Sequence, residues 1–227
     1  MRVRAPRRIR PGTLPIEQPG GRLRCLVLAR GAEEWIGVDL ASAAFVRVPG
    51  GIDAPIDDAD RSGLVVEFTI DHPDHSLDPS RPELALPATV PTVVGTLRPR
   101  VLRRFLDRLA TPEANGAMIL GTRGPSIAFV DLDGTTASLQ LLAIPVKNLE
   151  LAMSERDEPV CTIPWGGTTQ RTRVVDDRAA RAAIASAPRP LGGPQITAAL
   201  GFRPNFVLVG LGRVTDGHVP KVVMALL

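Results

Sequence analysis

Two aspartates separated by one residue stand at the end of an apolar run, where a strand could present both carboxylates. The stretch is Asp131-Leu132-Asp133-Gly134-Thr135. A carboxylate in such a position can attack phosphorus, while a neighbouring protonated carboxyl gives its proton to the leaving group. The same residues also suit a tight turn, because Asp-Gly is a favoured two-residue connection between antiparallel strands. The segment therefore predicts either a catalytic loop or a β-hairpin.

The pentapeptide resembles the first motif of the haloacid dehalogenase superfamily of phosphohydrolases. That resemblance implies Asp131 as the nucleophile, Asp133 as the acid–base and a magnesium ion beside them. The family's pattern continues with a Ser or Thr, a lysine and an acidic pair, in that order. Thr162 could serve second, but the only later lysine is Lys221 and no acidic residue follows it. Residues 136–144 are also rich in Thr, Leu and Ile, which favours a strand over a helix. We therefore expect a hairpin turn at Asp133-Gly134, with the magnesium-dependent phosphohydrolase as the alternative.

A second polar segment, "DHPDHSLD", places two histidines three residues apart. Histidine and carboxylate side chains can bind a metal ion. The candidate ligands are Asp71, His72, Asp74 and His75. Pro73 disfavours the helix that would align both imidazoles. We expect a polar surface loop from Asp71 to Pro91 and no metal ion, and no motif predicts a cofactor. A glycine-threonine loop, "PWGGTTQRTR", predicts a strand–loop–strand connection, with a phosphate cradle as the alternative.

Arginine supplies nearly all of the positive charge. Only Lys147 and Lys221 are lysines, so 25 of the 27 basic residues are arginines, and the formal net charge is +3. One group of arginines crowds the first ten residues among prolines, which predicts a flexible basic arm. Another lies along one face of a helix expected at residues 99–110. Such clusters bind phosphate backbones by releasing counterions. The candidate polyanion-binding residues are Arg2, Arg4, Arg7, Arg8, Arg10, Arg100, Arg103, Arg104 and Arg108.

Three stretches alternate apolar runs with turn residues: Arg22 to Val48, Asn115 to Ile144 and Asn205 to Leu227. The first two share an Arg-Gly pair followed by Val-Asp-Leu. Short turns between β-rich runs favour antiparallel β-meanders. Whether the three stretches are internal repeats is left open. Helices are expected at residues 99–110, 176–187 and 194–200, from apolar spacing, an aspartate cap and a terminating glycine.

The order strand, helix, three strands, from "PTVVGT" to Ile144-Pro145, resembles the repeating unit of DNA sliding clamps. At the level of the whole chain, these patterns predict an α+β fold, predominantly antiparallel β-meanders with two or three short helices. We expect an arm at residues 1–21 and a single domain at residues 22–227, with two subdomains, 22–148 and 149–227, as the alternative.

Composition limits the function classes. No apolar stretch is long enough to span a membrane, and no secretory signal follows the basic N-terminus, so the cytoplasm is the default location. Cys25 and Cys161 lie in apolar runs and are expected to be buried thiols. We predict a non-enzymatic intracellular binding or scaffolding protein that contacts nucleic acid or another polyanion. Because only 4% of residues are aromatic, such binding should tolerate any base sequence. A homo-oligomeric structural component is a further alternative.

Overall fold

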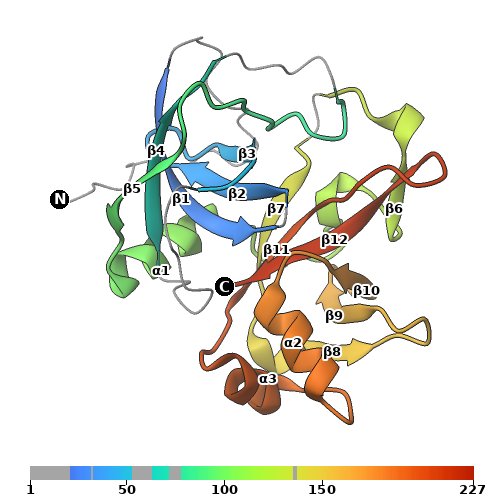
Figure 1. The fold of residues 1–227 in the computed structure, drawn as a ribbon. Coiled ribbons are helices and arrows are strands. Elements are labelled where there is room, and N and C mark those ends of the chain that lie inside the picture. The colour runs from blue at the N-terminus through green and yellow to red at the C-terminus, as the bar shows by residue number, and fades with distance from the viewer. Residues whose placement is uncertain (1–20, 32, 53–62, 72–77, 135–136) are drawn as a thin grey trace. The chain divides into compact units, whose positions relative to one another are not determined.

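The structure is a computed structural model that describes residues 21–31, 33–52, 63–71, 78–134 and 137–227. Contacts divide the chain into two compact units (Figure 1). Unit 1 is Met1–Leu109 with Asp133–Ser138, and unit 2 is Ala110–Leu132 with Leu139–Leu227. The chain first passes from unit 1 to unit 2 between Leu109 and Ala110. Nearly all of the predicted arm, residues 1–20, lies outside the described residues.

Unit 1 contains a five-stranded antiparallel sheet in the order β3-β2-β1-β4-β5. Its strands are β1 (Arg22–Arg30), β2 (Glu34–Asp39), β3 (Phe45–Pro49), β4 (Leu64–Thr69) and β5 (Thr92–Thr96). The alternating pattern of β1 places Leu23 and Cys25 in the core, while Arg22 and Arg24 on the opposite face are exposed. Trp35 packs edge-on against Phe68 in this core, with ring centroids 5.6 Å apart. The predicted first meander, β1-β2-β3, is confirmed.

The helix of unit 1 is α1 (Pro99–Leu109). It begins at the predicted proline, and it buries the apolar side that its sequence predicts. Proline is favoured at the first helical position, because its missing N–H would have no partner there. Phe105, Leu106 and Leu109 recur at helical spacing and are buried. In Figure 1 the helix follows β5 and lies beside the ends of the unit 1 strands.

Unit 2 contains a seven-stranded sheet with the path β7-β11-β12-β10-β9-β8 and with β6 paired to β12. Its strands are β6 (Ser126–Ala128), β7 (Leu139–Ala143), β8 (Glu150–Met153), β9 (Pro159–Trp165), β10 (Thr168–Val174), β11 (Phe206–Leu211) and β12 (His218–Leu226). Only β10 and β12 run parallel. The chain between them forms α2 (Arg178–Ser186), α3 (Gly193–Leu200) and β11, and Figure 1 shows the two helices beside one another.

In unit 2, α2 begins and α3 ends at the capping residues that the sequence predicts. Asp177 caps α2, since its side chain accepts a hydrogen bond from the Ala180 N–H at 2.9 Å. Gly201 ends α3 in the left-handed conformation, with φ of 73°. The hairpin β11–β12 confirms the third predicted meander. Gly166 and Gly167, both with positive φ, connect β9 to β10 as a strand–loop–strand.

The hairpin expected at Asp133-Gly134 is wrong. β6 pairs with β12 and β7 pairs with β11, so the two strands on either side of this segment are not partners. Between them the chain leaves unit 2, contributes residues 133–138 to unit 1 and then returns. The strand, helix, three strands order is therefore also divided between the units. Strand propensity located β7, but the strand expected to run through Val-Asp-Leu ends at Ala128, where β6 ends and a 3-10 turn begins. Pairing depends on contacts far away in the sequence, which a local pattern does not contain.

The loop predicted from Asp71 to Pro91 is partly wrong, because part of its second half is buried. Glu83 is 2% exposed and Ala85 is 1% exposed. The segment runs along β3, where the Arg47 N–H donates to the Glu83 carbonyl and the Ala85 N–H donates to the Arg47 carbonyl, both at 2.8 Å. These backbone bonds and the side-chain partners of Glu83 compensate for its burial.

Candidate polyanion-binding surface

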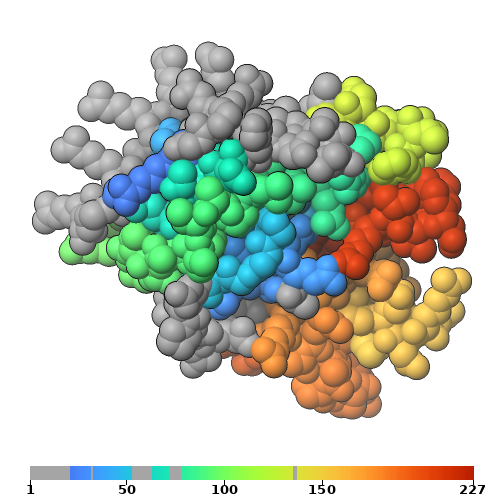
Figure 2. All heavy atoms as spheres, turned by 45° about the horizontal axis from the view of Figure 1, so that its top comes forward, coloured from blue at the N-terminus to red at the C-terminus, as the bar shows by residue number. Residues whose placement is uncertain are grey.

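The exposed side of α1 carries four arginines that the sequence singled out. Arg100, Arg103, Arg104 and Arg108 are all exposed, while the opposite side of the helix is packed against unit 1. We call these four residues the arginine face. The only acidic residue of the helix is Asp107, so positive charge predominates along its solvent side. Figure 2 shows the green segment that includes α1 at the surface of unit 1.

The spacing of the arginine face suits a regularly charged ligand. Arg100, Arg104 and Arg108 follow one another at four-residue intervals, which separates neighbouring Cα positions by about 6 Å along the helix axis. Consecutive phosphates of one nucleic-acid strand have a similar spacing, so a row of this kind can contact several of them at once. Arg108 stands in the last turn, where a positive charge also interacts favourably with the helix dipole.

Two arginines of β1 differ from the arginine face because they share one carboxylate, which offsets part of their charge. Arg22 and Arg24 both pair with Glu67 on β4, Arg24 through its Nε at 2.5 Å. Hydrogen bonds from Arg24, and then from Arg22, lower the pKa of the Glu67 carboxyl despite its burial. No ion pair is found for Arg100, Arg103 or Arg104 among the described residues. Their charges therefore remain available to a ligand.

A buried charged cluster in unit 1 was missed by the sequence analysis. Arg47 is fully buried on β3 and donates from Nη1 to Glu34 Oε1 at 2.8 Å. Its Nε donates to Ser138 Oγ at 3.2 Å. Glu83 accepts from the Ser138 N–H at 2.6 Å and from the Ser138 hydroxyl at 2.5 Å. Arg81 extends the cluster by pairing with Glu34 at 3.3 Å. The one sequence signal was a charged residue inside the apolar strand "FVRVP".

This cluster anchors Ser138 within unit 1. The N–H, carbonyl and hydroxyl of Ser138 all contact either Glu83 or Arg47, and Ser138 is itself fully buried. Burial raises the pKa of the Glu83 carboxyl, although the Arg47 charge and the Ser138 hydrogen bonds oppose the shift. Since Arg47, Glu83 and Ser138 are buried from solvent, we assign these contacts a structural role.

The two aspartates of the phosphohydrolase alternative lie in different units. Asp131 ends the short 3-10 turn Phe129–Asp131 in unit 2, and Asp133 belongs to the segment that joins unit 1. Both side chains are exposed. The preceding strand β6 is antiparallel to β12, and among the described residues between β6 and β7 this short 3-10 turn is the only helical element. The surroundings therefore differ from the parallel strand and following helix that the resemblance implies.

The histidine-rich segment lies largely outside the described residues. This applies to His72, Asp74 and His75, while the neighbouring Asp71 is described and exposed. Within the described ranges, no group of three or more His, Cys, Asp or Glu side chains is arranged to hold a metal ion. Cys25 and Cys161 are buried free thiols, as predicted, and burial raises the pKa of Cys161 to about 12. That pKa leaves the thiolate unpopulated near neutral pH.

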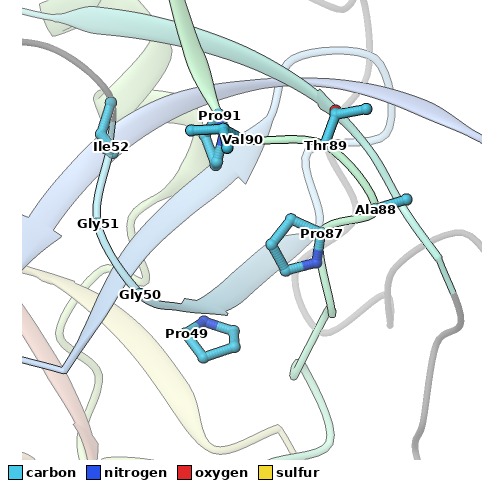
Figure 3. Close-up of a pocket in the computed structure, with 9 residues that line it drawn as sticks. All are labelled: Pro49, Gly50, Gly51, Ile52, Pro87, Ala88, Thr89, Val90 and Pro91. Carbon is cyan, nitrogen blue, oxygen red and sulfur yellow. The ribbon is translucent and has the colours of Figure 1, made fainter.

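An open groove of about 570 Å³ lies at one end of the unit 1 sheet (Figure 3). Two loops line it: Pro49 to Ile52 after β3, and Pro87 to Pro91 before β5. Its lining has no charged side chain, and Val90 is 63% exposed beside it. Thr89 is the one polar side chain of this lining, so the groove adds no charge to the arginine face and offers few polar groups to fix a small ligand's orientation.

Comparison of the chain with protein-family models, with curated proteins and with solved structures gave no match. Within the described chain, no helix combines the length and the apolarity needed to cross a lipid bilayer. We therefore infer function from the chain's own residues, of which the arginine face is the most clearly organised exposed group.

Proposed function

We propose that this protein is a non-enzymatic binding protein that contacts a polyanion through the arginine face of α1, with nucleic acid as the favoured partner class. The observation that carries the proposal is the concentration of four exposed arginines on one short helix. Arg22 and Arg24 of β1 share the Glu67 carboxylate, whereas Arg100, Arg103 and Arg104 have no ion-pair partner among the described residues. Each arginine that neutralises a phosphate releases a condensed counterion, which favours binding at low salt.

The proposed contact is with the nucleic-acid backbone and not with bases. The large apolar side chains exposed in the described chain are valines and methionines, none of them aromatic. Sequence-tolerant recognition of single strands relies on stacking against aromatic side chains. A helix that offers only guanidinium groups should instead bind duplexes of unrelated sequence with equal affinity, because phosphate contacts carry no sequence information.

The arginine face is tested by replacing three of its members. The variant Arg100→Gln/Arg103→Gln/Arg104→Gln should bind a mixed-sequence duplex at least tenfold more weakly at about 50 mM salt. The slope of the logarithm of its binding constant against the logarithm of the salt concentration should decrease in magnitude by about 2 to 3. Fluorescence anisotropy of a labelled duplex, repeated up to about 200 mM salt, measures both quantities. Glutamine is chosen because it keeps the helix propensity of the segment.

A matched control removes the same charge elsewhere. Arg156, Arg189 and Arg203 are exposed in separate loops of unit 2, so their replacement by glutamine gives the same net charge without touching α1. The control should keep most of the affinity and the salt slope. Equal losses in both variants would mean that overall charge, not the arginine face, drives binding. Absence of binding by the intact chain at low salt would refute the proposal as a whole.

A further inference from the structure

The strand β12 changes its neighbour at a single residue, Lys221. On one side, β6 pairs with His218 to Pro220, while β10 pairs with Val222 and Val223. The Lys221 N–H donates to the Pro125 carbonyl at 2.8 Å, just before β6 begins. Lys221 is therefore the point at which β12 passes from one partner strand to the other.

The Lys221 side chain is buried on the core side of the sheet. Residues two apart in a strand share a face, and Val219 and Val223, on either side of Lys221, both belong to the unit 2 core. Lys221 is only 3% exposed. Its Nζ donates to the Thr122 carbonyl at 2.6 Å, and no carboxylate of the described residues pairs with it. Two of the three N–H donors of the ammonium group remain without a protein acceptor there.

Lys221 still carries a charge at neutral pH. Burial lowers its pKa to about 8. A group with that pKa is about nine-tenths protonated at pH 7. A buried cation without a counter-charge is costly, and proteins usually pair such a group or neutralise it. A counter-charge beside the Lys221 Nζ would therefore stabilise the folded chain.

A second polar group at this position also has no partner. The Thr122 hydroxyl oxygen is buried and makes no hydrogen bond among the described residues. It belongs to the residue whose carbonyl accepts from Lys221, in the bend Gly121 to Pro125 that leads into β6. Arg123, the next residue of this bend, is exposed and adds positive charge nearby. Buried polar groups without partners are uncommon in folded proteins and call for an explanation.

We propose that Lys221 and Thr122 bind a small oxyanion, the carboxylate or phosphate group of a low-molecular-weight ligand, where β12 passes from β6 to β10. The ammonium group supplies the counter-charge and its two unused donors, and the Thr122 hydroxyl donates a further hydrogen bond. Charge-assisted hydrogen bonds of this kind are the stronger ones in proteins. The site lies entirely in unit 2 and is independent of the arginine face.

The two lysines of the chain make this proposal directly measurable. Selective isotope labelling of lysine gives one signal for Lys221 and one for Lys147, which is exposed and serves as the internal control. NMR titrations with inorganic phosphate and with acetate, at constant ionic strength, should shift the Lys221 signal to saturation and raise its apparent pKa. The Lys147 signal should not saturate. The stronger of the two responses identifies which oxyanion the site prefers.

Two variants test the assigned groups. Thr122→Val should weaken binding of the preferred anion about tenfold, the loss expected when one hydrogen bond to a charged ligand disappears. Lys221→Met should abolish the increase in melting temperature that the anion gives, provided that the variant folds. The wild-type titration decides the matter in any case. If Lys221 responds to neither anion, or only as Lys147 does, the proposal is wrong whatever the variants do.

Discussion

At the scale of single residues, the buried partners of Ser138 explain why the chain enters unit 1 between β6 and β7. Glu83 accepts two hydrogen bonds from Ser138, and Arg47 donates to the Ser138 hydroxyl at 3.2 Å. An ionised side chain in such a position is stabilising only while its partners remain. Removing Glu83 alone should therefore lower the free energy of unfolding by more than the net contribution of its contacts, because its partners stay buried without it.

We expect Glu83→Ala to lower the free energy of unfolding by about 3 kcal/mol, because it leaves both donors of Ser138 without their buried acceptor and removes the negative charge near Arg47. Urea unfolding at pH 7 measures this change. Glu150→Ala, at an exposed position of β8, is the control and should change stability by less than about 0.5 kcal/mol. A loss equally small for Glu83→Ala would show that the cluster does not anchor this segment.

The raised pKa of Glu83 also predicts the sign of a pH effect. A carboxyl with a higher pKa in the folded than in the unfolded state binds protons better when folded. It therefore contributes stability that is present below its ordinary pKa of 4.5 and lost as pH rises through the raised value. The stability of Glu83→Gln relative to the wild type should thus increase from pH 4 towards pH 7. A difference that stays constant over this range would contradict the direction of the shift.

At the scale of elements, a single aspartate joins the start of α2 to the last strand. Asp177 is 3% exposed. One of its carboxylate oxygens caps α2 at Ala180, and the other accepts from the Leu226 N–H at 2.8 Å. The side chain therefore provides an acceptor for one N–H in the first turn of α2, which has no partner within the helix, and for one backbone N–H of β12.

Asp177→Ala should destabilise the protein by about 2 to 3 kcal/mol, the sum of a lost helix cap and a buried N–H left without an acceptor. Hydrogen exchange should accelerate most at the amides of Ala180 and Leu226. Asp177→Asn retains one acceptor oxygen and should lose roughly half as much. If both variants lose the same amount, the carboxylate charge, and not the number of acceptors, makes the larger contribution.

The sheet edges bear on the predicted homo-oligomer. Isolated bridges from Leu84, Thr111 and Leu191 cover β3, β7 and β8. Among the described residues, no such bridge covers the outer edge of β5. β5 is short, and its register with β4 is interrupted by a bulge at Val65/Val66, both features that discourage strand addition. The homo-oligomer stays a prediction.

At the scale of the whole molecule, the net charge of +3 conceals an uneven distribution. Positive charge is concentrated in the first ten residues and on α1, while other arginines are paired or scattered. Electrostatic attraction to a polyanion depends on this local density more than on the total.

Removing residues 1 to 12, with their five arginines, should flatten the salt dependence of duplex binding by as much as about 4 in the log–log slope. The same anisotropy titration measures it. Replacing those five arginines by lysine keeps the charge and should leave the slope nearly unchanged. A truncated chain with the wild-type slope would show that the N-terminal residues take no part and that α1 is sufficient.

The sequence by itself determined the α+β class, most strand positions and all three helices. Apolar periodicity, Pro99, Asp177 and Gly201 are local signals that act within a few residues. It also placed the arginine face, because helical spacing separates Arg100, Arg103, Arg104 and Arg108 from the buried side. Only the tertiary structure decided the partners of β6 and β7, the burial of Arg47 and Glu83 and the position of Lys221 between two strands. These depend on contacts between residues up to 99 positions apart, and such pairing is fixed by packing and hydrogen-bond satisfaction in the folded chain.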